Sequence, residues 1–488
     1  MTITAPATTA NASAHPPFQW AASTRPSGAA RPAAPAPLRR VPTWWRDASG
    51  AAMWALLLFV SALWVKGGGL QDVGTVAGFL TSFGRLTGLI ASALLLVQVF
   101  LMARVPWFER AWGQDELART HRLVGFTSFN LMLAHVVLIT LGYAAASPQG
   151  LWGTIVDFTL NYPGMLLAIA GTLALIMVVV TSVKKARAKL RYESWHLIHL
   201  YGYLGAGLAL PHQLWTGADF LSSRLATVCW WSAYAACLAA VLIWRVAVPF
   251  VRTRRSALHV VGVRAETPDV TTVTLRGRGL NRLGAQAGQF FNWRFQDGPG
   301  WTRANPYSLS AAPTDDTLRI TVKHLGDGSA RLADLAVGTK AVIEGPYGRL
   351  HPGTRTRTKV ALLGAGIGIT PMRALLEALP QGSDDVSVIH RVSTRDDLVL
   401  GDELDALARE RGARYVVVEG RRIPGRETWL PAQAAHLSDV DALRQFVPDI
   451  AERDVYICGA PAWMDAAKAA ALGAGVPAAA IHVEYFTY

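Results

Sequence analysis

The sequence is poor in cysteine, with Cys229, Cys237 and Cys458 as the only thiols among 488 residues. Three cysteines cannot build a disulfide framework, and they cannot supply the four thiolates of an iron–sulfur cluster. A fused ferredoxin module is therefore excluded. The first residues also lack a basic start followed directly by an apolar core, so we expect no cleavable signal peptide.

Acidic residues are outnumbered, with 34 Asp and Glu against 47 Lys and Arg, which gives a formal net charge of +13. Such an excess is compatible with binding to nucleic acid or to anionic lipid. Here the basic residues flank long apolar runs, and hydrophobic residues make up 51% of the chain. This pattern favours a lipid bilayer as the partner and gives no reason to expect nucleic acid.

Residues 1–43 form an Ala- and Pro-rich tail that we expect to be disordered. Residues 44–253 contain apolar runs, several of which reach the roughly 20 residues that span a bilayer. We predict six spans, at 51–66, 78–103, 121–144, 163–183, 195–214 and 225–248. Basic residues precede the first span and follow the second, fourth and sixth spans. This alternation predicts that both termini are cytoplasmic and that the protein is a multi-pass cell-membrane protein.

Four histidines in these spans form two pairs of similar spacing. His121 and His135 are 14 residues apart on the third span, which places them within about 40° on one helix face and roughly 21 Å apart along the axis. His199 and His212 are 13 residues apart on the fifth span, where Pro211 can break the helix and re-aim His212. An ionisable side chain inside a span is costly and indicates function.

Two matched histidine pairs can bind two haems as metal ligands. The inner ligands would be His121 and His199, and the outer ligands would be His135 and His212. Two axial imidazoles fill both open positions of the iron and favour electron transfer over substrate binding at the metal. His196 remains an alternative to His199, and any single histidine could instead be a hydrogen-bonded interior residue.

The pattern changes after residue 253. Short β-branched segments separated by Gly, Asp and Pro predict an antiparallel β-barrel over residues 254–353. Strands then alternate with helical stretches over residues 354–488, which predicts a doubly wound parallel sheet. We therefore expect a multi-domain protein with a six-helix transmembrane bundle, a flavin-binding barrel and a nicotinamide-binding α/β domain.

The barrel contains a candidate flavin motif, Asn305-Pro306-Tyr307-Ser308. The Tyr307 ring can lie against the isoalloxazine, and the Ser308 hydroxyl can lie near its N5, so both are candidate catalytic residues. A later segment offers backbone N–H groups and polar side chains to a pyrophosphate, with Lys323, Gly326, Gly328 and Ser329 as its candidate ligands. The segment Gly345-Pro346-Tyr347-Gly348 follows.

A glycine-rich loop follows the first strand of the α/β region. Its candidate ligands for a dinucleotide pyrophosphate are Gly364, Gly366, Gly368 and Thr370, although the spacing is not GxGxxG. After the second strand come Arg391, Ser393 and Arg395, which suit a ribose 2′-phosphate. NADPH is therefore favoured, and the acidic pair Asp396 and Asp397 keeps NADH open.

The chain ends with two further candidate contacts to the cofactors. Cys458 and Gly459 end the last long strand, where α/β sheets bind ligands, so we expect them at the nicotinamide. The alternative for Cys458 is a small buried hydrophobic residue. Phe486 in the terminal segment can cover the flavin until the nicotinamide displaces it, and a frayed end is the alternative.

With these residues in place, the chain resembles the ferric reductase and NADPH oxidase superfamily over about residues 50–488. The histidine pairs, RYESWHLIHLYGY, NPYSLS, GAGIGITP and CGAPAWM with the HVEYF tail carry the resemblance. It implies hydride transfer from NADPH to FAD, followed by single electrons through the inner and the outer b-type haem. Many relatives have Arg two places before the Tyr of the flavin motif; here that position is Asn305, and Arg303 is the nearest candidate for the flavin phosphate.

The electron acceptor stays open from the sequence. A ferric chelate, oxygen, a quinone and an extracytoplasmic protein all fit, because the outer loops are short and show no dedicated site. A membrane cytochrome subunit that relays electrons to a partner is a different class of function, and a transporter or membrane anchor with a fused flavin domain is another. A complete nicotinamide domain argues against a simple relay. The sequence leaves the oligomeric state open.

Overall fold

The computed structural model describes residues 44–187, 189–190, 192–379 and 385–485. The predicted N-terminal tail and Phe486 lie outside the described residues. The chain divides into two compact units. One contains the described residues up to 356, with 370–379 and 482–485, and the other contains residues 357–369 and 385–481.

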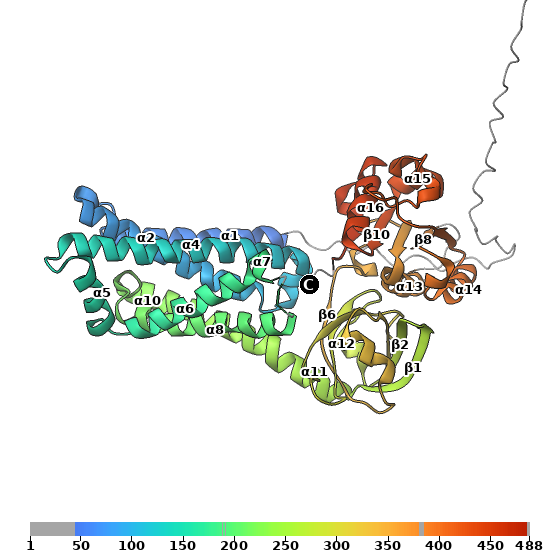
Figure 1. Ribbon diagram of the computed structural model, residues 1–488, viewed down its shortest axis with the longest axis horizontal. Helices are drawn as coiled ribbons and strands as arrows, with labels where there is room; N and C mark the ends of the chain where they lie inside the picture. The colour runs from blue at the N-terminus through green and yellow to red at the C-terminus, as the bar shows by residue number, and fades with distance from the viewer. Residues whose placement is uncertain (1–43, 188, 191, 380–384, 486–488) are drawn as a thin grey trace, which may run out of the picture. The chain divides into compact units, whose positions relative to one another are not determined.

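Helices make up the first part of the first unit (Figure 1). Among them, α2 packs along α4 and α6 packs along α8. The six-residue π-helical segment η2 joins α10 to α11 without a break. The helices are α1 (Trp44–Lys66), α2 (Val76–Leu101), α3 (Pro106–Trp112), α4 (Gln114–Ala146), α5 (Gly150–Asn161), α6 (Met165–Ser182), α7 (Lys184–Arg187), α8 (Tyr192–Trp215), α9 (Ala218–Leu221), α10 (Arg224–Val241), η2 (Leu242–Ala247) and α11 (Val248–Ser256).

Five helical segments within the described residues are long and apolar enough to cross a membrane. They are α1, α2, most of α4, α6 and the continuous run Arg224–Ser256. The sixth predicted span corresponds to α8, which has 24 residues but is not among the five. Its three histidines reduce its apolar character, so its crossing stays a prediction. The predicted boundary at residue 253 falls inside α11.

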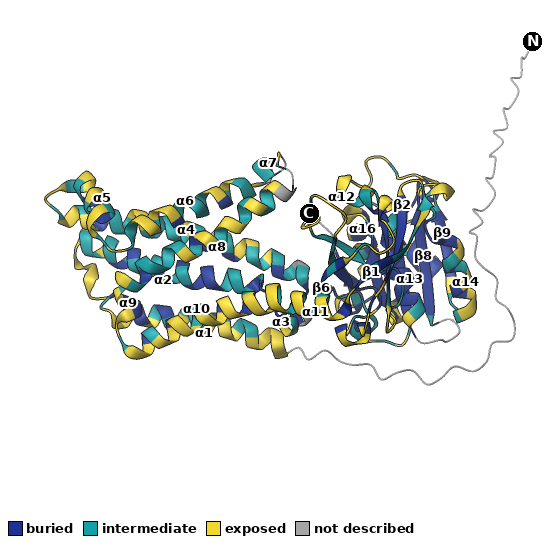
Figure 2. Cartoon of the chain, turned by 90° about the horizontal axis from the view of Figure 1, so that it is seen from below, coloured by how far each residue is buried: buried dark blue, intermediate teal, exposed yellow. Residues whose placement is uncertain are grey.

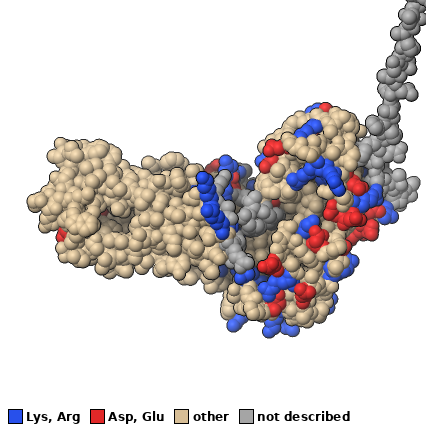
Figure 3. All heavy atoms as spheres, in the orientation of Figure 1, with Lys and Arg blue, Asp and Glu red and all other residues tan. Residues whose placement is uncertain are grey.

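The outward face of the bundle is apolar. Several large hydrophobic side chains there are at least 60% exposed, among them Leu123, Phe126, Leu173 and Leu225. Figure 2 shows many exposed positions along these helices, and most of the visible bundle surface in Figure 3 has no charged side chain. An apolar surface of this extent fits contact with lipid better than contact with water.

Two three-stranded antiparallel sheets stand where the sequence predicts a barrel, with strand orders β1-β2-β5 and β4-β3-β6. Isolated bridges join the edges of the two sheets, His259 with Lys340 and Leu309 with Ile320. Side chains such as Phe291 and Trp293 fill the core between them. The strands are β1 (His259–Thr267), β2 (Val270–Arg276), β3 (Phe290–Phe295), β4 (Asn305–Ser308), β5 (Thr317–Lys323) and β6 (Ala341–Tyr347), and α12 (Asp327–Ala330) follows β5.

The predicted α/β fold is present after residue 357. Its sheet has the order β11-β10-β7-β8-β9, and β10, β7, β8 and β9 run parallel. Every residue of β8 and β10 is buried, as expected for strands covered on both faces. The strands are β7 (Val360–Ala365), β8 (Val386–Val392), β9 (Arg414–Glu419), β10 (Asp454–Cys458) and β11 (Ile481–Val483); the helices are α13 (Ile369–Ala378), α14 (Gly401–Arg411), α15 (Asp439–Phe446) and α16 (Pro461–Gly473).

Candidate functional site

The two predicted inner histidines face each other across the bundle. The ring centroids of His121 on α4 and His199 on α8 lie 6.0 Å apart, with the rings inclined at 64°. A metal bound at about 2 Å from one nitrogen of each ring would require centroids at roughly this distance. His196 lies one turn earlier on α8 and interacts electrostatically with Arg245 and Glu344 instead. The geometry therefore pairs His121 with His199.

Backbone carbonyls of α2 orient both histidines of α4. His121 Nδ1 lies 3.0 Å from the Gln98 carbonyl oxygen, and His135 Nδ1 lies 2.7 Å from the Gly84 carbonyl oxygen. A carbonyl oxygen can only accept, so each Nδ1 carries the proton and donates it. The Nε2 atom of each neutral ring then keeps its lone pair, which is the form that binds a metal.

Hydroxyl groups orient the two candidate ligand histidines of α8. His199 Nδ1 lies 3.3 Å from Ser182 Oγ, which gives its own proton to the Val178 carbonyl oxygen at 2.6 Å. His212 Nδ1 lies 2.7 Å from Thr216 Oγ1, which donates to the His212 carbonyl oxygen at 2.7 Å. Both hydroxyls are therefore acceptors toward the imidazoles, and all four rings share one tautomer.

The predicted outer pair is set by close helix contacts. His135 and His212 are near enough to interact electrostatically. A Cβ atom at Gly88 would lie 2.5 Å from His135 Nδ1, so only glycine lets α2 approach α4 here. A Cβ atom at Gly164, whose φ is +80°, would lie 2.8 Å from the backbone nitrogen of His212. Helix α8 continues through Pro211, so the helix break that we expected there does not occur.

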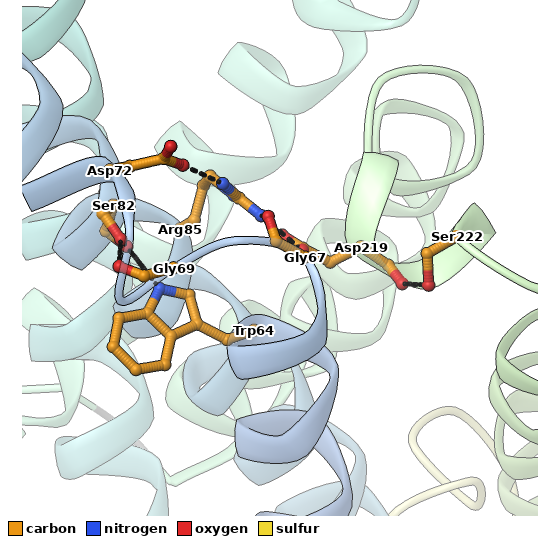
Figure 4. Close-up of polar contacts among 8 residues, drawn as sticks. All are labelled: Trp64, Gly67, Gly69, Asp72, Ser82, Arg85, Asp219 and Ser222. Carbon is orange, nitrogen blue, oxygen red and sulfur yellow. Dashed lines mark hydrogen bonds and ion pairs between the residues drawn. The ribbon is translucent and has the colours of Figure 1, made fainter.

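A charged group next to the outer pair is fully partnered (Figure 4). Arg85 of α2 makes two bonds to Asp219, with Nη2–Oδ1 at 2.6 Å and Nε–Oδ2 at 3.0 Å. It also contacts Asp72 Oδ2 at 3.1 Å and the Gly67 carbonyl oxygen at 2.9 Å. These bonds tie α2 to the loop after α1 and to α9, beside Gly84, whose carbonyl oxygen orients His135.

The structure brings the two predicted flavin segments together. Tyr307 of β4 pairs with Phe291 of β3, and its carbonyl oxygen accepts from Trp293 Nε1 at 3.0 Å. Burial raises the pKa of the Tyr307 phenol, so the ring stays neutral. A Cβ atom at Gly328 would lie 3.5 Å from Asn305 Oδ1, so the glycine segment lies beside β4. Pro306 and Ser308 are half-buried in the same strand.

The polar side chains of the second flavin segment have local partners. Ser329 Oγ accepts from the backbone N–H groups of Leu325 at 2.8 Å and Gly326 at 3.1 Å. The hydroxyl therefore closes the turn that leads into α12. Lys323 Nζ lies 2.9 Å from Asp269 Oδ2. These contacts shape the loop, and a phosphate would have to share or replace them.

One basic residue near the flavin motif was not predicted from the sequence. Arg319 of β5 donates through Nη2 to the carbonyl oxygen of Ser310 at 2.7 Å, and through Nε to Ser310 Oγ at 3.2 Å. Ser310 is fully buried and also accepts from Thr321 Oγ1 at 2.9 Å. The predicted Arg303 is exposed. The signal that could have identified Arg319 is a cation between the apolar residues Leu318 and Ile320 of the strand.

The glycine loop and the last long strand are in direct contact, as both nicotinamide predictions require. Cys458 pairs with Gly364 in the parallel register. A Cβ atom at Gly368 would lie 2.3 Å from the Cys458 carbonyl oxygen, and one at Gly459 would lie 2.9 Å from the Ala365 Cβ atom. Glycine is therefore needed on both segments for the backbones to approach. The side chain of Cys458 is itself buried.

Arg391 does not lie with the other residues predicted for the 2′-phosphate. It is buried at the end of β8, and its Nη1 donates to the carbonyl oxygens of Val392 and of Val418, the latter at 3.4 Å. Burial, together with the nearby charge of Arg422, lowers its pKa to about 10. The guanidinium is therefore directed at the sheet backbone, which separates it from the solvent-exposed end of the strand.

Ser393 and Arg395 are exposed beyond β8. The Nε atom of Arg395 lies 3.4 Å from Glu419 Oε2 at the end of β9. The exposed pair Arg421 and Arg422 follows after Gly420. This pair was not predicted, although a basic dipeptide close to the end of a parallel strand is the signal that identifies it.

Two families match separate parts of the chain. Residues 87–210 match the ferric reductase like transmembrane component, and residues 362–469 match the oxidoreductase NAD-binding domain. The first match contains His121, His135 and His199, and the second contains the glycine loop and Cys458. Both parts of the sequence-based assignment are confirmed.

Curated relatives match the reductase portion. The ferredoxin reductase component of 3-ketosteroid-9-alpha-monooxygenase from Mycobacterium tuberculosis is 34% identical over 212 residues, which is 42% of this chain and 56% of the relative. A flavohemoprotein from Xylella fastidiosa is 32% identical over 209 residues, 41% of this chain and 51% of the relative. The chain thus spans about half the length of these relatives.

Among solved structures, the chain is similar to an Amycolatopsis cytochrome P450 reductase, with 25% identity and a TM-score of 0.40. The match covers 48% of this chain and 70% of that protein. The apolar helices and the two family matches together indicate a membrane part followed by a reductase part. The chain joins a ferric reductase like transmembrane component to an oxidoreductase NAD-binding domain, and it is a membrane-associated oxidoreductase.

Proposed function

We propose that this protein carries electrons from cytosolic NAD(P)H through FAD and two bis-histidine b-type haems to an acceptor on the outer side of the membrane. The observation that carries the proposal is the facing pair His121 and His199, 6.0 Å between ring centroids, with every candidate ligand held through Nδ1. The sixth span, formed by α8, and closure of the two antiparallel sheets into a flavin barrel belong to the same proposal.

The residues present fit the two haems. Each pair joins one histidine of α4 to one of α8, and each Nε2 keeps a lone pair for the iron. When bound, the haems supply one-electron chemistry, because both axial positions are filled. The bundle's own contribution is to fix the imidazole orientation and to surround the pairs with apolar side chains.

The residues of the antiparallel domain and of the glycine loop fit FAD and a nicotinamide dinucleotide. Tyr307 and Ser308 lie on β4 beside Gly328, and the Gly364–Gly368 loop contacts the end of β10. FAD bound there would accept two electrons from the nicotinamide and could release them one at a time, which is the form in which haem would accept them. We favour NADPH, because the exposed Arg395 and Arg422 follow the ends of the neighbouring strands β8 and β9, while Arg391 is turned into the sheet.

The direction of transfer rests on the basic residues of the bundle. The turn after α2, the segment α7 and the helix α11 all carry Lys or Arg, and in Figures 1 and 2 they lie at the same end of the bundle. This end would be cytoplasmic, with both termini on that side. Electrons would then leave near His135 and His212, toward a ferric chelate or oxygen.

A second candidate function is relay to a partner protein or a quinone. It is favoured because several relatives are reductase components or subunits of monooxygenases. In that case the outer haem edge, rather than a small-molecule site, would face the acceptor.

Spectra of purified membranes test the main proposal. A reduced-minus-oxidised spectrum should show b-type haem bands that NADPH reduces, and their absence would sink the proposal. His135→Leu and His212→Leu should keep NADPH-driven reduction of a soluble dye while abolishing transfer across the membrane. If both activities stay unchanged, the outer haem assignment is wrong.

The inner ligand can be identified by a matched pair of variants on one helix. His199→Ala should lose one of two haems per protein, because the ring that faces His121 is removed. His196→Ala should keep both haems, because His196 interacts electrostatically with Arg245 and Glu344, whereas His199 is the ring that lies against His121. The reverse result would assign the inner ligand to His196.

A further inference from the structure

A cluster of buried charges lies where the helix bundle meets the antiparallel domain, both within the first compact unit. Its centre is Glu344 of β6, which is only 5% exposed. None of its members was predicted to bind a cofactor. We call it the Glu344 cluster, and its members are Arg104, Glu109, Arg245, Arg294, Glu344 and Tyr347.

The carboxylate of Glu344 has partners from both sides. Arg245 of η2 reaches it from the bundle, with Nη1–Oε1 at 3.8 Å. Arg294 of β3 reaches it from its own domain, with Nη2–Oε2 at 3.6 Å, and Tyr347 donates its hydroxyl to Oε1 at 3.0 Å. Arg245 is the one of these three partners that belongs to the bundle, so its charge compensates the buried carboxylate only while the domain stays against the bundle.

The turn between α2 and α3 makes a second contact. The guanidinium of Arg104 lies 4.1 Å above the centroid of the Tyr347 ring, and its Nη1 lies 3.2 Å from Glu109 Oε1. Arg104 has a φ of +64°, a left-handed backbone conformation that is rare outside glycine. Backbone strain of this kind persists where the surroundings fix it and often marks a functional position.

Strand β6 is also bonded to α11. The backbone N–H of Ile343 donates to Thr253 Oγ1 at 3.3 Å, and Arg252 donates to the Gly345 carbonyl oxygen. The segment that carries Arg245 is π-helical, a local irregularity that is frequent at functional sites. Two helical segments, η2 and α11, and the turn between α2 and α3 thus converge on the five residues from Ile343 to Tyr347.

Glu344 remains ionised in this environment. Burial alone would raise the pKa of its carboxyl, but the guanidinium groups of Arg245, Arg104 and Arg294 outweigh burial and hold the pKa below its ordinary value. Burial raises the pKa of the Tyr347 phenol far above its ordinary value, so Tyr347 remains a donor. The contact is therefore a true ion pair at neutral pH.

The cluster lies close to the candidate inner haem. His196 of α8 interacts electrostatically with Arg245, Arg294 and Glu344. The ring that faces His121 belongs to His199, one helical turn further along. The histidine that interacts with the cluster, His196, is thus about one helical turn from His199, at the proposed electron entry point into the bundle.

We propose that the Glu344 cluster is an ionic latch that holds the antiparallel domain against the bundle and thereby sets the rate of electron transfer from the flavin to the inner haem. This inference rests on the proposed function for its electron-transfer half. Glu344, Tyr347, Arg104 and Arg245 are positioning residues, because none of them contacts His121 or His199 in the structure. The latch also gives a role to the segment from Gly345 to Gly348, which the flavin assignment leaves unused.

Three variants and one control test the latch in the full-length protein. Glu344→Gln removes the charge at constant shape, and Tyr347→Leu removes the ring beneath Arg104. Tyr347→Phe keeps the ring but loses the hydroxyl, so its effect should be smaller than that of Tyr347→Leu. The control is Asp316→Asn, which breaks an exposed ion pair with Arg276 on the same domain.

Stopped-flow reduction of the haems by NADPH gives the first readout. We expect the rate to fall about tenfold in Glu344→Gln and Tyr347→Leu, since each removes a contact that spans the two parts. Reduction of a soluble dye by the flavin should change less than about twofold, because the flavin and nicotinamide sites are untouched. An unchanged haem-reduction rate in both variants would overturn the electron-transfer half of the latch.

Hydrogen exchange gives a second readout that needs no haem. In the full-length protein as purified, exchange in residues 341–347 and 103–109 should rise in Glu344→Gln and Tyr347→Leu, and stay as in the parent in Asp316→Asn. Unchanged exchange would overturn the latch itself, even if the haem spectra support the proposed function. Missing haem bands in the parent, with exchange raised in the variants, would instead overturn the proposed function and keep the latch.

Discussion

The helix bundle and the α/β domain hold their candidate cofactor sites by different means. In the bundle, glycines such as Gly88 also allow close helix contacts, but the functional side chains are oriented by hydrogen bonds to carbonyl and hydroxyl groups, as for His135 and His212. In the α/β domain, glycines let one backbone approach another, as where Gly368 meets the end of β10. The bundle should therefore suffer most when a polar partner is removed, and the α/β domain when an atom is added.

The largest effect is expected at Arg85. Arg85→Met keeps the length of the side chain but leaves Asp219, which is 7% exposed, without its main partner. Breaking a buried ion pair from one side costs about 3 kcal/mol or more. We expect the midpoint of thermal unfolding of the purified protein to fall by several degrees and the outer haem to be lost first.

Asp72→Asn is the matched control for Arg85, because Asp72 is about half exposed and makes one of the weaker contacts. It should change the free energy of unfolding by less than about 1 kcal/mol. Equal effects of the two variants would show that charge removal alone, rather than burial, governs this end of the bundle.

His390 is an exception to this difference, because it is a buried polar group with a hydrogen-bond partner in the α/β domain. It is fully buried in β8, and its Nδ1 lies 3.0 Å from the Tyr415 hydroxyl. Burial lowers its pKa from 6.5 to about 3. The folded state therefore binds the proton less readily than the unfolded state, so stability is complete above about pH 6.5 and is lost as the pH falls toward 3.

The slope should approach about 1.4 kcal/mol per pH unit below pH 6, or about 3 kcal/mol by pH 4. The measurement is hydrogen exchange of residues 386–392 in the full-length protein, each pH point being compared with His390→Leu, which cannot titrate. If the parent and the variant lose protection in parallel, His390 does not control the acid stability of this sheet.

The sequence could predict the features that depend on local spacing. The pairing of His121 with His199 follows from helical periodicity, and contact between the glycine loop and Cys458 follows from the rule that parallel strands present ligands at one edge. The α/β topology was predictable for the same reason, because strand and helix alternate along the chain.

Features that depend on distant partners could not be predicted. Glu344, Arg245 and Arg104 come from three remote parts of the chain, and only packing of the antiparallel domain on the bundle unites them. Arg391 looked like a phosphate ligand because it ends a strand, but its side chain folds back to Val418. The direction of a long side chain depends on its surroundings, which a single sequence does not contain.

Gly368 tests the α/β side of the comparison directly. Gly368→Ala would place a Cβ atom 2.3 Å from the Cys458 carbonyl oxygen, so either the loop or the strand end must move. We expect a loss of about 1–3 kcal/mol in stability and a raised KM for NADPH with little change at the haems. Gly262→Ala, where a Cβ atom meets nothing within 4 Å, is the control. Normal NADPH kinetics in Gly368→Ala would mean that the close approach is not required.

Thr216 tests the bundle at its finest scale. Thr216→Val keeps the shape of the side chain but removes the oxygen that accepts from His212 Nδ1 at 2.7 Å. Loss of such a partner weakens metal binding by about 10- to 100-fold, and we expect the lower end because the helix backbone still positions the ring. The measurement is the rate of haem transfer to an excess of a haem-free acceptor protein.

Thr227→Val is the control, because the Thr227 hydroxyl bonds only to backbone carbonyls away from both histidine pairs. If the two variants lose haem at the same rate, the Thr216 hydroxyl does not orient His212. Helix packing would then fix the ligand geometry in the bundle, just as backbone packing shapes the glycine loop of the α/β domain.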